Sequence, residues 1–309
     1  MATEEQLRIL AEKAVPGCTL LHWRPLHGGI SYAMTAVDIR TGNGDARAIV
    51  VRVPSAELSA YDPQCIEDEF RLLEITRAQG LPTPTPLYLH RKAAASPANC
   101  MVLDYIEGVP AVHAGNPIDC AHQFAAHLVA IHRIDETAAD IGFLKERRVF
   151  LADWLAKTPK GLDESLNEGE IRNALHDSGP IRPDRNGLVL LHGDFWPGNV
   201  LWRDERIAGV IDWEEAVRGD PVMDVAITRL DLMWTYGRDA MDAFTENYRS
   251  LSRFDLADLP YWDLWAALRP MGALDVWATG WARIGRDDVN ETTLRAGHRE
   301  FVNAALEIL

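Results

Sequence analysis

The sequence predicts an α+β fold in two lobes, a small antiparallel β-sheet lobe with one helix and a larger, mainly helical lobe. Two observations lead to this prediction. Short runs of alternating or β-branched residues, separated by turn residues, fill the first third of the chain. Apolar residues recur at helical spacing through most of the remainder. We place the boundary near 104–108 and divide the chain into 1–104 and 105–309, with ligands expected in the cleft between the lobes.

The first lobe opens with an amphipathic helix, because Thr3 and Gln6 have the spacing of a capping box. TGNGD at 41–45 is a strong hairpin turn. The predicted strands before and after this turn are 19–24, 34–39 and 48–53, which form an antiparallel meander, and they are followed by a helix at 64–79 and by strands PLYLH and CMVLDY.

The second lobe is predicted to be mostly helical, with two short strands in its middle. Helices are expected at 118–134 and 149–157, a polar stretch of loop and short helix at 158–187, strands LVLLH and RIAGVID, and helices throughout the chain after 221. We find no internal repeat and no low-complexity segment in the sequence.

Composition excludes several classes of protein. The net charge of −15 argues against a nucleic-acid binder, which usually carries a basic face. No apolar run approaches the roughly 20 residues of a membrane span, and MATEEQLRILAEKAV lacks the regions of a signal peptide. The four cysteines are scattered without a CxxC pair, so we expect reduced thiols and a cytoplasmic protein. The sequence gives no indication of oligomeric state.

The segment LLHGDFWPGNVLWRDERIAGVIDWEE, residues 190–215, carries the chemistry. A Pro-Gly turn separates Asp194 from Asn199, and Asp212 ends an apolar strand, where a carboxylate is costly unless a partner compensates it. Mg²⁺ prefers carboxylate and amide oxygens. We therefore expect Asn199 and Asp212 to hold a metal ion, while Asp194 accepts or orients the proton of an acceptor hydroxyl.

The pattern His192-Gly193-Asp194, then Asn199, then IDWE and GDPxxD, resembles the aminoglycoside phosphotransferase and choline-kinase-like families. The resemblance implies a bilobal protein-kinase-like fold and Mg²⁺-dependent transfer of a nucleotide γ-phosphate to a hydroxyl of a small molecule. ATP is the expected donor, with GTP left open. In the family the last 80 residues of the chain build the acceptor pocket.

The first lobe contains the other parts that the resemblance requires. Gly28, Gly29 and Ser31 lie in a turn that could cover the phosphates, although Tyr32 stands where the family frequently has Asn. Arg52, in VVRVP, is expected to bind the phosphate oxygens of the nucleotide.

The partner expected for Arg52 is Glu69, which aligns with the family's helical glutamate, and Glu67 and Glu74 are competitors. The adenine edge would be read by the backbone of the hinge, at Asp104, Tyr105 and Ile106.

Residues after the motif are expected to support the loop or to line the acceptor site. Asp220 and Asp224 should accept backbone N–H groups of the catalytic loop, and His192 should support it. The acceptor stays open among aminoglycosides, macrolides, sugars and amino alcohols. Acidic side chains in the acceptor site would favour a cationic acceptor, and the candidate acids are Glu214, Glu215, Asp231, Asp263 and Asp275. Tryptophans would favour a flatter, more apolar acceptor, and the candidates are Trp213, Trp234 and Trp262.

Two rival functions come from other classes. The stretch 29–33 loosely resembles the G-x-S-x-G elbow of serine hydrolases, but that elbow needs a helix after the serine, and here the sequence predicts strands. The second rival is a nucleotide-binding pseudokinase or scaffold. Since Asp194, Asn199 and Asp212 are all present, we favour the enzyme.

Overall fold

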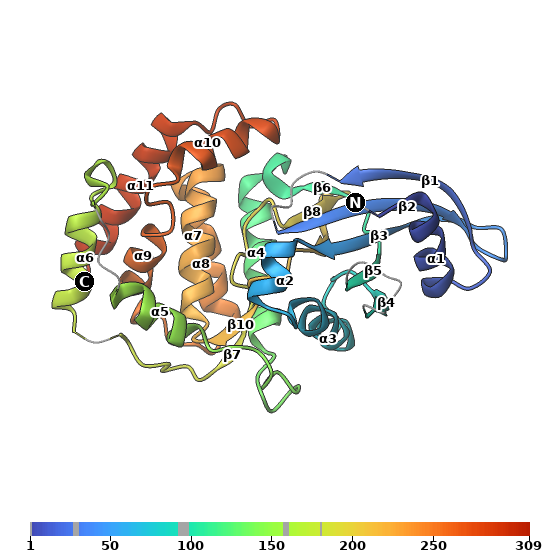
Figure 1. Ribbon diagram of the computed structural model, residues 1–309. Coiled ribbons are helices and arrows are strands. Elements are labelled where there is room, and N and C mark those ends of the chain that lie inside the picture. Colours follow the sequence, from blue (N-terminus) through green and yellow to red (C-terminus); the bar gives the residue numbers. More distant parts are fainter. Residues whose placement is uncertain (1, 27–30, 92–98, 157–160, 180) are drawn as a thin grey trace. The chain divides into compact units, whose positions relative to one another are not determined.

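The computed structural model describes residues 2–26, 31–91, 99–156, 161–179 and 181–309, with only the backbone of 152–156 included. Its internal contacts divide the chain into two compact units (Figure 1). The first comprises 1–108 together with 208–214, and the second comprises 109–207 together with 215–309. The predicted boundary after residue 104 placed 208–214 with the second lobe, whereas the contacts group this segment with the first unit.

The first unit is built on a five-stranded antiparallel sheet in the order β1-β2-β3-β5-β4. The strands are β1 (Thr19–Leu26), β2 (Tyr32–Arg40), β3 (Ala46–Pro54), β4 (Pro86–His90) and β5 (Cys100–Asp104). The predicted meander is present in β1 to β3. The last strand of the chain in this sheet, β5, lies between β3 and β4, and β4 begins with a proline at the edge, where a missing N–H donor is tolerated.

Three helices accompany the sheet: α1 (Glu4–Ala14), α2 (Ala56–Tyr61) and α3 (Cys65–Ala78). Helices were predicted at the positions of α1 and α3, although the predicted fold class named only one helix in this lobe. The capping box of α1 is confirmed, because the Thr3 side chain accepts from the Gln6 N–H and the Gln6 side chain accepts from the Thr3 N–H. The unpredicted α2 is a short helix capped by Ser55, whose hydroxyl accepts from the Leu58 N–H.

The core of the first unit explains which way Arg52 points. Alternate residues of β3, Ile49 and Val51, are buried against α1, in a cluster that also contains Leu7 and Val37. Side chains alternate between the two faces of a strand. Arg52 therefore lies on the opposite face of the sheet from this cluster.

The second unit is mainly helical, and β9 crosses from it into the first. Its elements are β6 (Val109–Pro110), the 3-10 helix η1 (Ala111–His113), α4 (Pro117–His132), α5 (Arg147–Ala156), the 3-10 helix η2 (Glu164–Leu166), α6 (Glu168–Asp177), β7 (Val189–Leu191), β8 (Val200–Arg203), β9 (Arg206–Val210), β10 (Val217–Gly219), α7 (Val222–Tyr236), α8 (Arg238–Leu251), α9 (Leu259–Ala267), α10 (Leu274–Arg283) and α11 (Glu291–Leu306).

Helix α7 is the centre of the second unit. It is buried along almost its whole length and packs against α8, α9 and α11. A helix that is apolar on nearly all sides belongs in an interior. The motif residue Asp224 and the suggested acceptor-lining residue Asp231 both lie on this helix, so their carboxylates are buried and need partners.

Three short strands in the second unit were not predicted: β6, β8 and β10. Strands of two to four residues carry too little alternation to be recognised. They nevertheless fix the motif, because β7 pairs with β10 through Leu191↔Val217, and β8 pairs with β6 through Trp202↔Val109. The first pairing brings the segment before the HGD loop beside the segment before GDPxxD.

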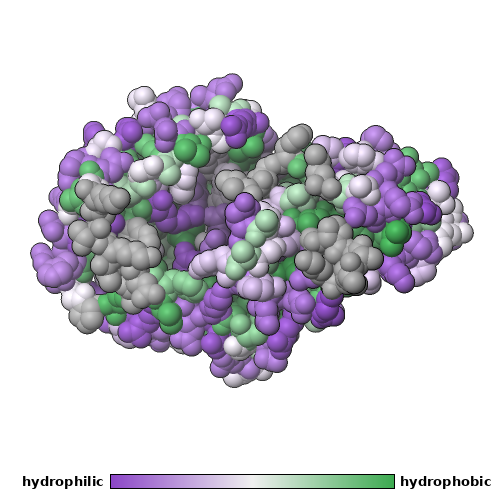
Figure 2. Space-filling model, in the orientation of Figure 1, coloured by the Kyte–Doolittle hydropathy of each residue, from purple (hydrophilic) through white to green (hydrophobic). Residues whose placement is uncertain are grey.

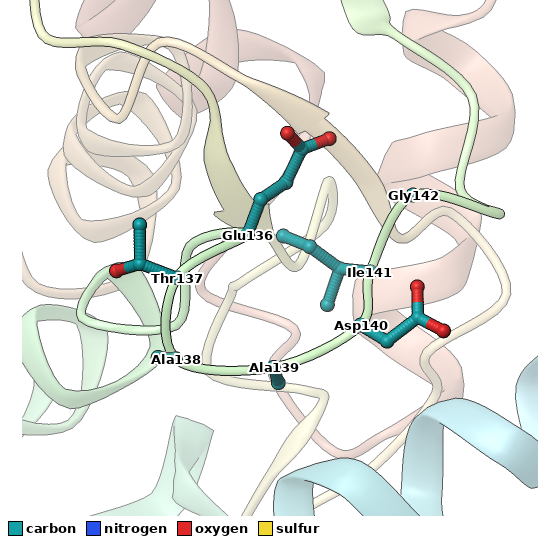
Figure 3. A pocket seen from close by; sticks show the side chains of 7 residues that line it. All are labelled: Glu136, Thr137, Ala138, Ala139, Asp140, Ile141 and Gly142. Atoms are coloured by element: carbon teal, nitrogen blue, oxygen red, sulfur yellow. The ribbon is translucent and has the colours of Figure 1, made fainter.

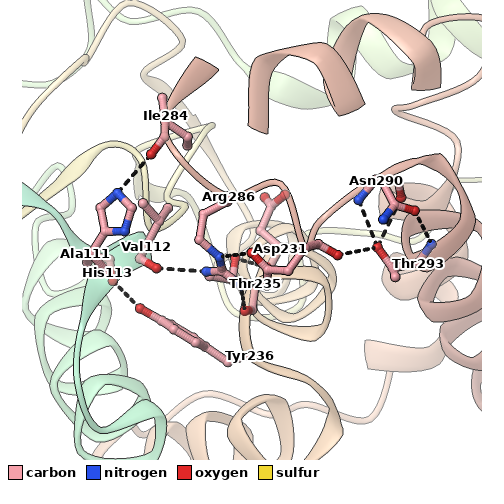
Figure 4. Close-up of polar contacts among 11 residues, drawn as sticks. Ala111, Val112, His113, Asp231, Thr235, Tyr236, Ile284, Arg286, Asn290 and Thr293 are labelled. Atoms are coloured by element: carbon pink, nitrogen blue, oxygen red, sulfur yellow. Dashed lines mark hydrogen bonds and ion pairs between the residues drawn. The ribbon is translucent and has the colours of Figure 1, made fainter. Parts of the chain in front are cut away.

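The C-terminal helices are tied back to the start of the second unit through Arg286 (Figure 4). Its Nη1 donates to the Val112 carbonyl at 2.7 Å and its Nη2 to the Thr235 carbonyl at 2.8 Å. The Tyr236 hydroxyl donates to the Ala111 carbonyl nearby. These bonds connect η1, the end of α7 and the loop after α10.

The surface resembles that of an ordinary globular chain. On the face in Figure 2, hydrophilic residues predominate and hydrophobic residues form small separate patches. Within the described residues, no helix combines the length and the apolarity needed to cross a membrane.

Candidate active site

The first unit gathers three carboxylates around one buried guanidinium. Arg52 Nη1 lies 2.8 Å from Glu69 Oε1. Its Nη2 lies 2.8 Å from Asp212 Oδ1 and 3.4 Å from Glu214 Oε2. The guanidinium lies over the Tyr32 ring, with the Arg52 Cζ 3.8 Å from the ring centroid. The predicted pair of Arg52 with Glu69 is therefore present, while the competitor Glu67 pairs with Arg91 instead.

This cluster has more negative than positive charge. Burial raises the pKa of Glu69, and the nearby Asp212 carboxylate raises it further against the effect of Arg52. Burial and Asp212 likewise raise the pKa of Glu214 to about 7. Burial alone would lower the pKa of Arg52, but the Glu69 and Asp212 carboxylates outweigh it and the pKa is raised.

The Arg52–Glu69 pair is close but incompletely bonded. Although the two charged groups are within ion-pair distance, both Glu69 oxygens and Arg52 Nε are buried without a hydrogen-bond partner among the described residues. Uncompensated buried polar atoms are costly and concentrate at functional positions. The cluster is thus unlike a saturated structural salt bridge.

Asp212 has a strained backbone. Its φ is 65°, in the left-handed region that side-chain-bearing residues rarely adopt. The buried Trp213 beside it donates from Nε1 to the Val210 carbonyl at 3.1 Å, which anchors the turn after β9. Such strain persists only where surrounding contacts enforce it, and it is frequent at active sites.

The predicted phosphate turn is described only in part. Gly28 and Gly29 lie outside the described residues. The Ser31 hydroxyl donates to Glu214 Oε1 at 3.2 Å, so it faces the carboxylate cluster around Arg52. Ser31 and Glu214 are far apart in the sequence and meet at this point.

The predicted hinge, residues 104–106, begins at the last residue of β5. The N–H of Asp104 donates to the Thr85 carbonyl at 2.9 Å, and that of Tyr105 to the Ala48 carbonyl at 3.3 Å. Of the three predicted hinge residues, Asp104 and Tyr105 therefore already use their backbone N–H groups. The Ile106 side chain packs on Gly209 of β9, where an added Cβ would lie 2.7 Å from its Cδ1.

In the second unit, Asp194 and Asn199 meet within the loop between β7 and β8. Asn199 Nδ2 donates to Asp194 Oδ2 and to the Asp194 carbonyl, both at 3.0 Å. Asn199 is buried, whereas Asp194 is partly exposed. With its nitrogen turned toward Asp194, the Asn199 side-chain oxygen points the other way.

Asp224 of α7 braces this loop, as predicted. Its carboxylate accepts the backbone N–H of His192 at 2.7 Å and that of Gly193 at 3.0 Å, and it lies 3.4 Å from His132 Nε2. Burial opposes ionisation, but the His132 hydrogen bond and the surrounding donors outweigh it and lower the pKa of Asp224. The same prediction for Asp220 is not met by its hydrogen bonds, because its carboxylate accepts from the backbone N–H groups of Asn186 at 3.2 Å and Val222 at 3.0 Å, which lie outside the HGD loop.

Two residues of the HGD motif are also structural. His192 is fully buried, and its Nδ1 lies 3.4 Å from the Asp194 N–H, in agreement with its predicted support of the loop. Gly193 has a φ of 82°, and an added Cβ there would lie 2.2 Å from the Glu215 carbonyl oxygen. Only glycine fits this position.

Two contacts of the site were missed from the sequence. Arg269, from the segment after α9, places Nη2 at 2.5 Å from Asp194 Oδ1. Glu214 joins Arg52 and Ser31, although the sequence suggested it only as an acid that could face an acceptor. No local pattern marks Arg269, because its partners lie far along the chain.

The residues suggested as acceptor-lining are mostly core residues, so that suggestion is wrong for them. Asp231 and Asp263 are buried in ion pairs with Arg269 and Arg229. Burial raises the pKa of Asp231 to about 7 and that of Asp263 to about 6. The tryptophans Trp213, Trp234 and Trp262 are likewise buried.

The second unit contains a pocket with a different lining. It is formed by a single loop, residues 136–142, whose side chains are drawn in Figure 3. None of the predicted site residues lines it, so we connect it with no function.

Comparison with known proteins identifies the family. The model of the phosphotransferase enzyme family matches residues 22–270, which is most of the chain. The chain belongs to the phosphotransferase enzyme family.

Solved structures resemble this phosphotransferase-family chain over nearly its full length. A macrolide 2′-phosphotransferase type I has a TM-score of 0.61 and 21% identity, covering 97% of this chain and 98% of its own. A macrolide 2′-phosphotransferase of Brachybacterium faecium has a TM-score of 0.63 and 20% identity, covering 97% of both chains. At these identities the likeness shows the fold, and it confirms the predicted α+β, protein-kinase-like class.

Curated relatives match part of this phosphotransferase-family chain. Acyl-CoA dehydrogenase family member 10 of Mus musculus is 25% identical over 203 residues, 60% of this chain and 18% of its own. Acyl-CoA dehydrogenase family member 11 of Rattus norvegicus is 25% identical over 191 residues, 55% of this chain and 23% of its own. The matched region thus covers about a fifth of the length of these relatives.

The residues of this phosphotransferase-family chain fit Mg²⁺ as a partly protein-held ion. Among the described residues, no three His, Cys, Asp or Glu side chains are arranged to hold one metal. Mg²⁺ rarely needs such a cage, because it is usually held by one or two carboxylates together with waters and phosphate oxygens. The charge excess around Arg52, where Asp212 and Glu214 share its Nη2, is chemically suited to a cation accompanied by phosphates.

Proposed function

We propose that this chain catalyses Mg²⁺-dependent transfer of a nucleotide γ-phosphate, with ATP as the expected donor, to a hydroxyl of a small molecule. The observation that carries the proposal is the pair of fixed polar clusters, one around Arg52 and one around Asp194, at the positions that the family motif assigns to phosphate binding and catalysis. The family match supports phosphoryl transfer as the class of reaction.

Each residue has a distinct part in the proposed reaction. Asp194 would orient the acceptor hydroxyl and take its proton while the hydroxyl oxygen bonds to the γ-phosphorus and the bond to the nucleoside diphosphate breaks. Asn199 and Asp212 would hold Mg²⁺, which supplies charge neutralisation at the phosphates. Arg52, held by Glu69, and the turn of Gly28, Gly29 and Ser31 would bind the phosphates.

The adenine would be read by backbone groups of the hinge at 104–106, with Ile106 as the N–H donor. This part of the proposal rests on the backbone N–H groups of Asp104 and Tyr105, which already donate to the carbonyls of Thr85 and Ala48. Because a backbone donor reads one edge of a purine, ATP and GTP would differ in affinity, and competition between them tests the assignment.

The acceptor is proposed only as a hydroxylated small molecule. Aminoglycosides and macrolides come first, because chains of similar structure include a macrolide 2′-phosphotransferase and an aminoglycoside-3′-phosphotransferase. Sugars and amino alcohols complete the class. The net charge of −15 would favour a cationic acceptor over an anionic one at long range. The free cysteines agree with a cytoplasmic location.

The test is transfer of labelled γ-phosphate from ATP and from GTP, with Mg²⁺, to a panel of these acceptors. The control variant is Asp194→Asn, which keeps the shape of the side chain and removes its capacity to accept a proton. A labelled product that disappears in the control supports the enzyme and identifies the acceptor class.

Two other outcomes would count against the proposal. Tight binding of Mg–nucleotide without any product, over the whole panel, would favour the pseudokinase or scaffold. Absence of nucleotide binding, measured by calorimetry on the folded protein, would exclude both nucleotide-dependent functions.

A further inference from the structure

We propose that Arg269 is a positioning residue for Asp194, and that buried Asp231 holds Arg269 in place. The inference rests on the proposed function, because it concerns the orientation of the group that would face the acceptor hydroxyl. It adds a requirement that the HGD motif does not contain.

The Asp194 carboxylate is held from two sides. Arg269 Nη2 lies 2.5 Å from Oδ1, and Asn199 Nδ2 donates to Oδ2 at 3.0 Å. A carboxylate with one donor on each oxygen cannot rotate about its terminal torsion without breaking a bond. Both donors are on the same unit as Asp194, so this orientation does not depend on the other unit.

Arg269 is itself fixed by its surroundings. Its Nη1 lies 3.2 Å from Asp231 Oδ2, and its guanidinium carbon lies 5.5 Å from the centroid of the Trp277 ring. Its backbone N–H donates to the Ala266 carbonyl at 3.1 Å, and Pro270 follows it, which restricts the backbone of Arg269 as well.

The two carboxylates bound by Arg269 differ in exposure. The Asp231 side chain is 7% exposed and the Asp194 side chain 29% exposed. Asp231 cannot exchange Arg269 for water, whereas Asp194 can reach solvent or a ligand. The buried Asp231 therefore fixes Arg269, and Arg269 in turn holds the partly exposed Asp194 carboxylate.

Only arginine can make both contacts at once. The planar guanidinium addresses one carboxylate through each of its two terminal nitrogens, whereas a lysine ammonium is a single point that cannot span both. Pre-set orientation of a catalytic group lowers the barrier, and a misplacement of about 1 Å can cost about 100-fold in rate. Loss of Arg269 should therefore lower kcat more than it weakens nucleotide binding.

The experiment compares Arg269→Gln and Arg269→Lys with a matched control, Arg229→Gln. Arg229 is another largely buried arginine of the second unit, 3.1 Å from the buried Asp263. Among the described residues, no hydrogen bond or ion pair joins it to Asp194, whose arginine partner is Arg269. The readouts are kcat, the KM for nucleotide and for acceptor, and the midpoint of thermal unfolding.

We expect Arg269→Gln to lower kcat by about 10- to 100-fold with little change in the KM for nucleotide. Arg269→Lys should recover part of the lost kcat, and Asp231→Asn should lower kcat less than Arg269→Gln. Combining Asp231→Asn with Arg269→Gln should add nothing, because both act through the same contact. Arg229→Gln should lower the unfolding midpoint while keeping the wild-type kcat.

The inference is overturned if Arg269→Gln keeps the wild-type kcat, or if Arg229→Gln loses as much kcat as Arg269→Gln. Should Arg269→Gln fail to fold, Arg269→Lys and Asp231→Asn decide the matter, and wild-type kcat in both overturns it. Failure of the proposed function is recognised separately, because the wild-type protein would then transfer phosphate to no acceptor.

Discussion

Replacing Arg52 by methionine tests the first polar cluster most directly. Methionine keeps the length of the side chain and removes the charge that compensates Glu69, Asp212 and Glu214. Glu69 is 5% exposed and would then be buried without a cation. Breaking a buried ion pair from one side costs about 3–5 kcal/mol. Because burial already raises the pKa of Glu69, its protonation in the variant would bring the loss toward the lower end of that range.

A second variant separates stability from function. In the double variant R52M/E69L, both charges of the buried pair are replaced by apolar groups of similar size. Such replacement of a buried ion pair is often neutral or even stabilising. We therefore expect the double variant to recover most of the stability that the single variant loses. It should not recover nucleotide binding, because the proposed phosphate donor is still absent.

The assays are urea unfolding followed by tryptophan fluorescence, and calorimetric titration with Mg–ATP. Hydrogen bonds to charged groups contribute about 1.5–3 kcal/mol each, so both variants should bind Mg–ATP about 10- to 100-fold more weakly than the wild type. The matched control is Arg91→Met, because the Arg91–Glu67 pair contacts the same helix α3 but is exposed. Its removal should change stability by less than about 1 kcal/mol.

Either of two results would refute this reasoning. Wild-type affinity for Mg–ATP in R52M/E69L would show that Arg52 does not bind the phosphates. An unchanged free energy of unfolding in Arg52→Met would show that Glu69 has another source of compensation, although its oxygens are buried and have no hydrogen-bond partner among the described residues.

Three further predictions concern stability and reactivity. Gly193→Ala should destabilise by more than about 3 kcal/mol and abolish transfer, because its Cβ would lie 2.2 Å from a backbone oxygen. The matched Gly187→Ala, at φ 79° with no atom within 4 Å of its Cβ, should cost only about 1–2 kcal/mol in the same thermal unfolding experiment. Burial raises the pKa of Asp263 to about 6 from its ordinary value of 3.8, so the folded state binds the proton more tightly. The stability that this proton contributes is therefore fully present below pH 3.8 and is lost as the pH rises through 6. The variant Asp263→Asn should flatten the profile of unfolding free energy against pH in this window. An unchanged slope in the variant would contradict the assignment. Burial raises the pKa of the Cys100 thiol to about 11 and that of Cys120 to about 12, so a thiol reagent at mildly alkaline pH should label these two only after unfolding, as mass spectrometry of the labelled peptides would show.

Much of the fold could be predicted because its signals are local. The capping box of Thr3 and Gln6, the hairpin turn at 41–45 and the periodicity of α4 each involve residues within a few positions of one another. The pairing of Arg52 with Glu69 was predicted from the family resemblance rather than from a local signal. Its physical basis is the alternation of β3, which sends Arg52 to the face opposite α1.

The support of the HGD loop by Asp224 was also predictable, because an acid at the start of an apolar helix needs donors. The helix α7 is apolar on nearly all sides, so its carboxylate had to be buried with partners. The part played by His132, which contacts Asp224 from α4, was not visible in the sequence, where it is one of several histidines in a helix.

The acids suggested as acceptor-lining show where local reading fails. Asp231 and Asp263 are buried against arginines on other elements, while Glu215 is exposed. A carboxylate in a sequence looks the same whether it faces water or an arginine 34 or 38 positions away. The difference lies in tertiary contacts that leave no periodic pattern.

The sequence by itself determined the fold class, the family motif and the pairs that follow from strand and helix periodicity. The tertiary structure alone decided that Arg269, 75 residues from Asp194, holds one oxygen of its carboxylate, and that Glu214, 183 residues from Ser31, shares the cluster of Arg52. The physical reason is range: backbone propensity and side-chain periodicity act over a few residues, whereas a buried charge is satisfied by whichever partner the packed chain brings within about 3 Å.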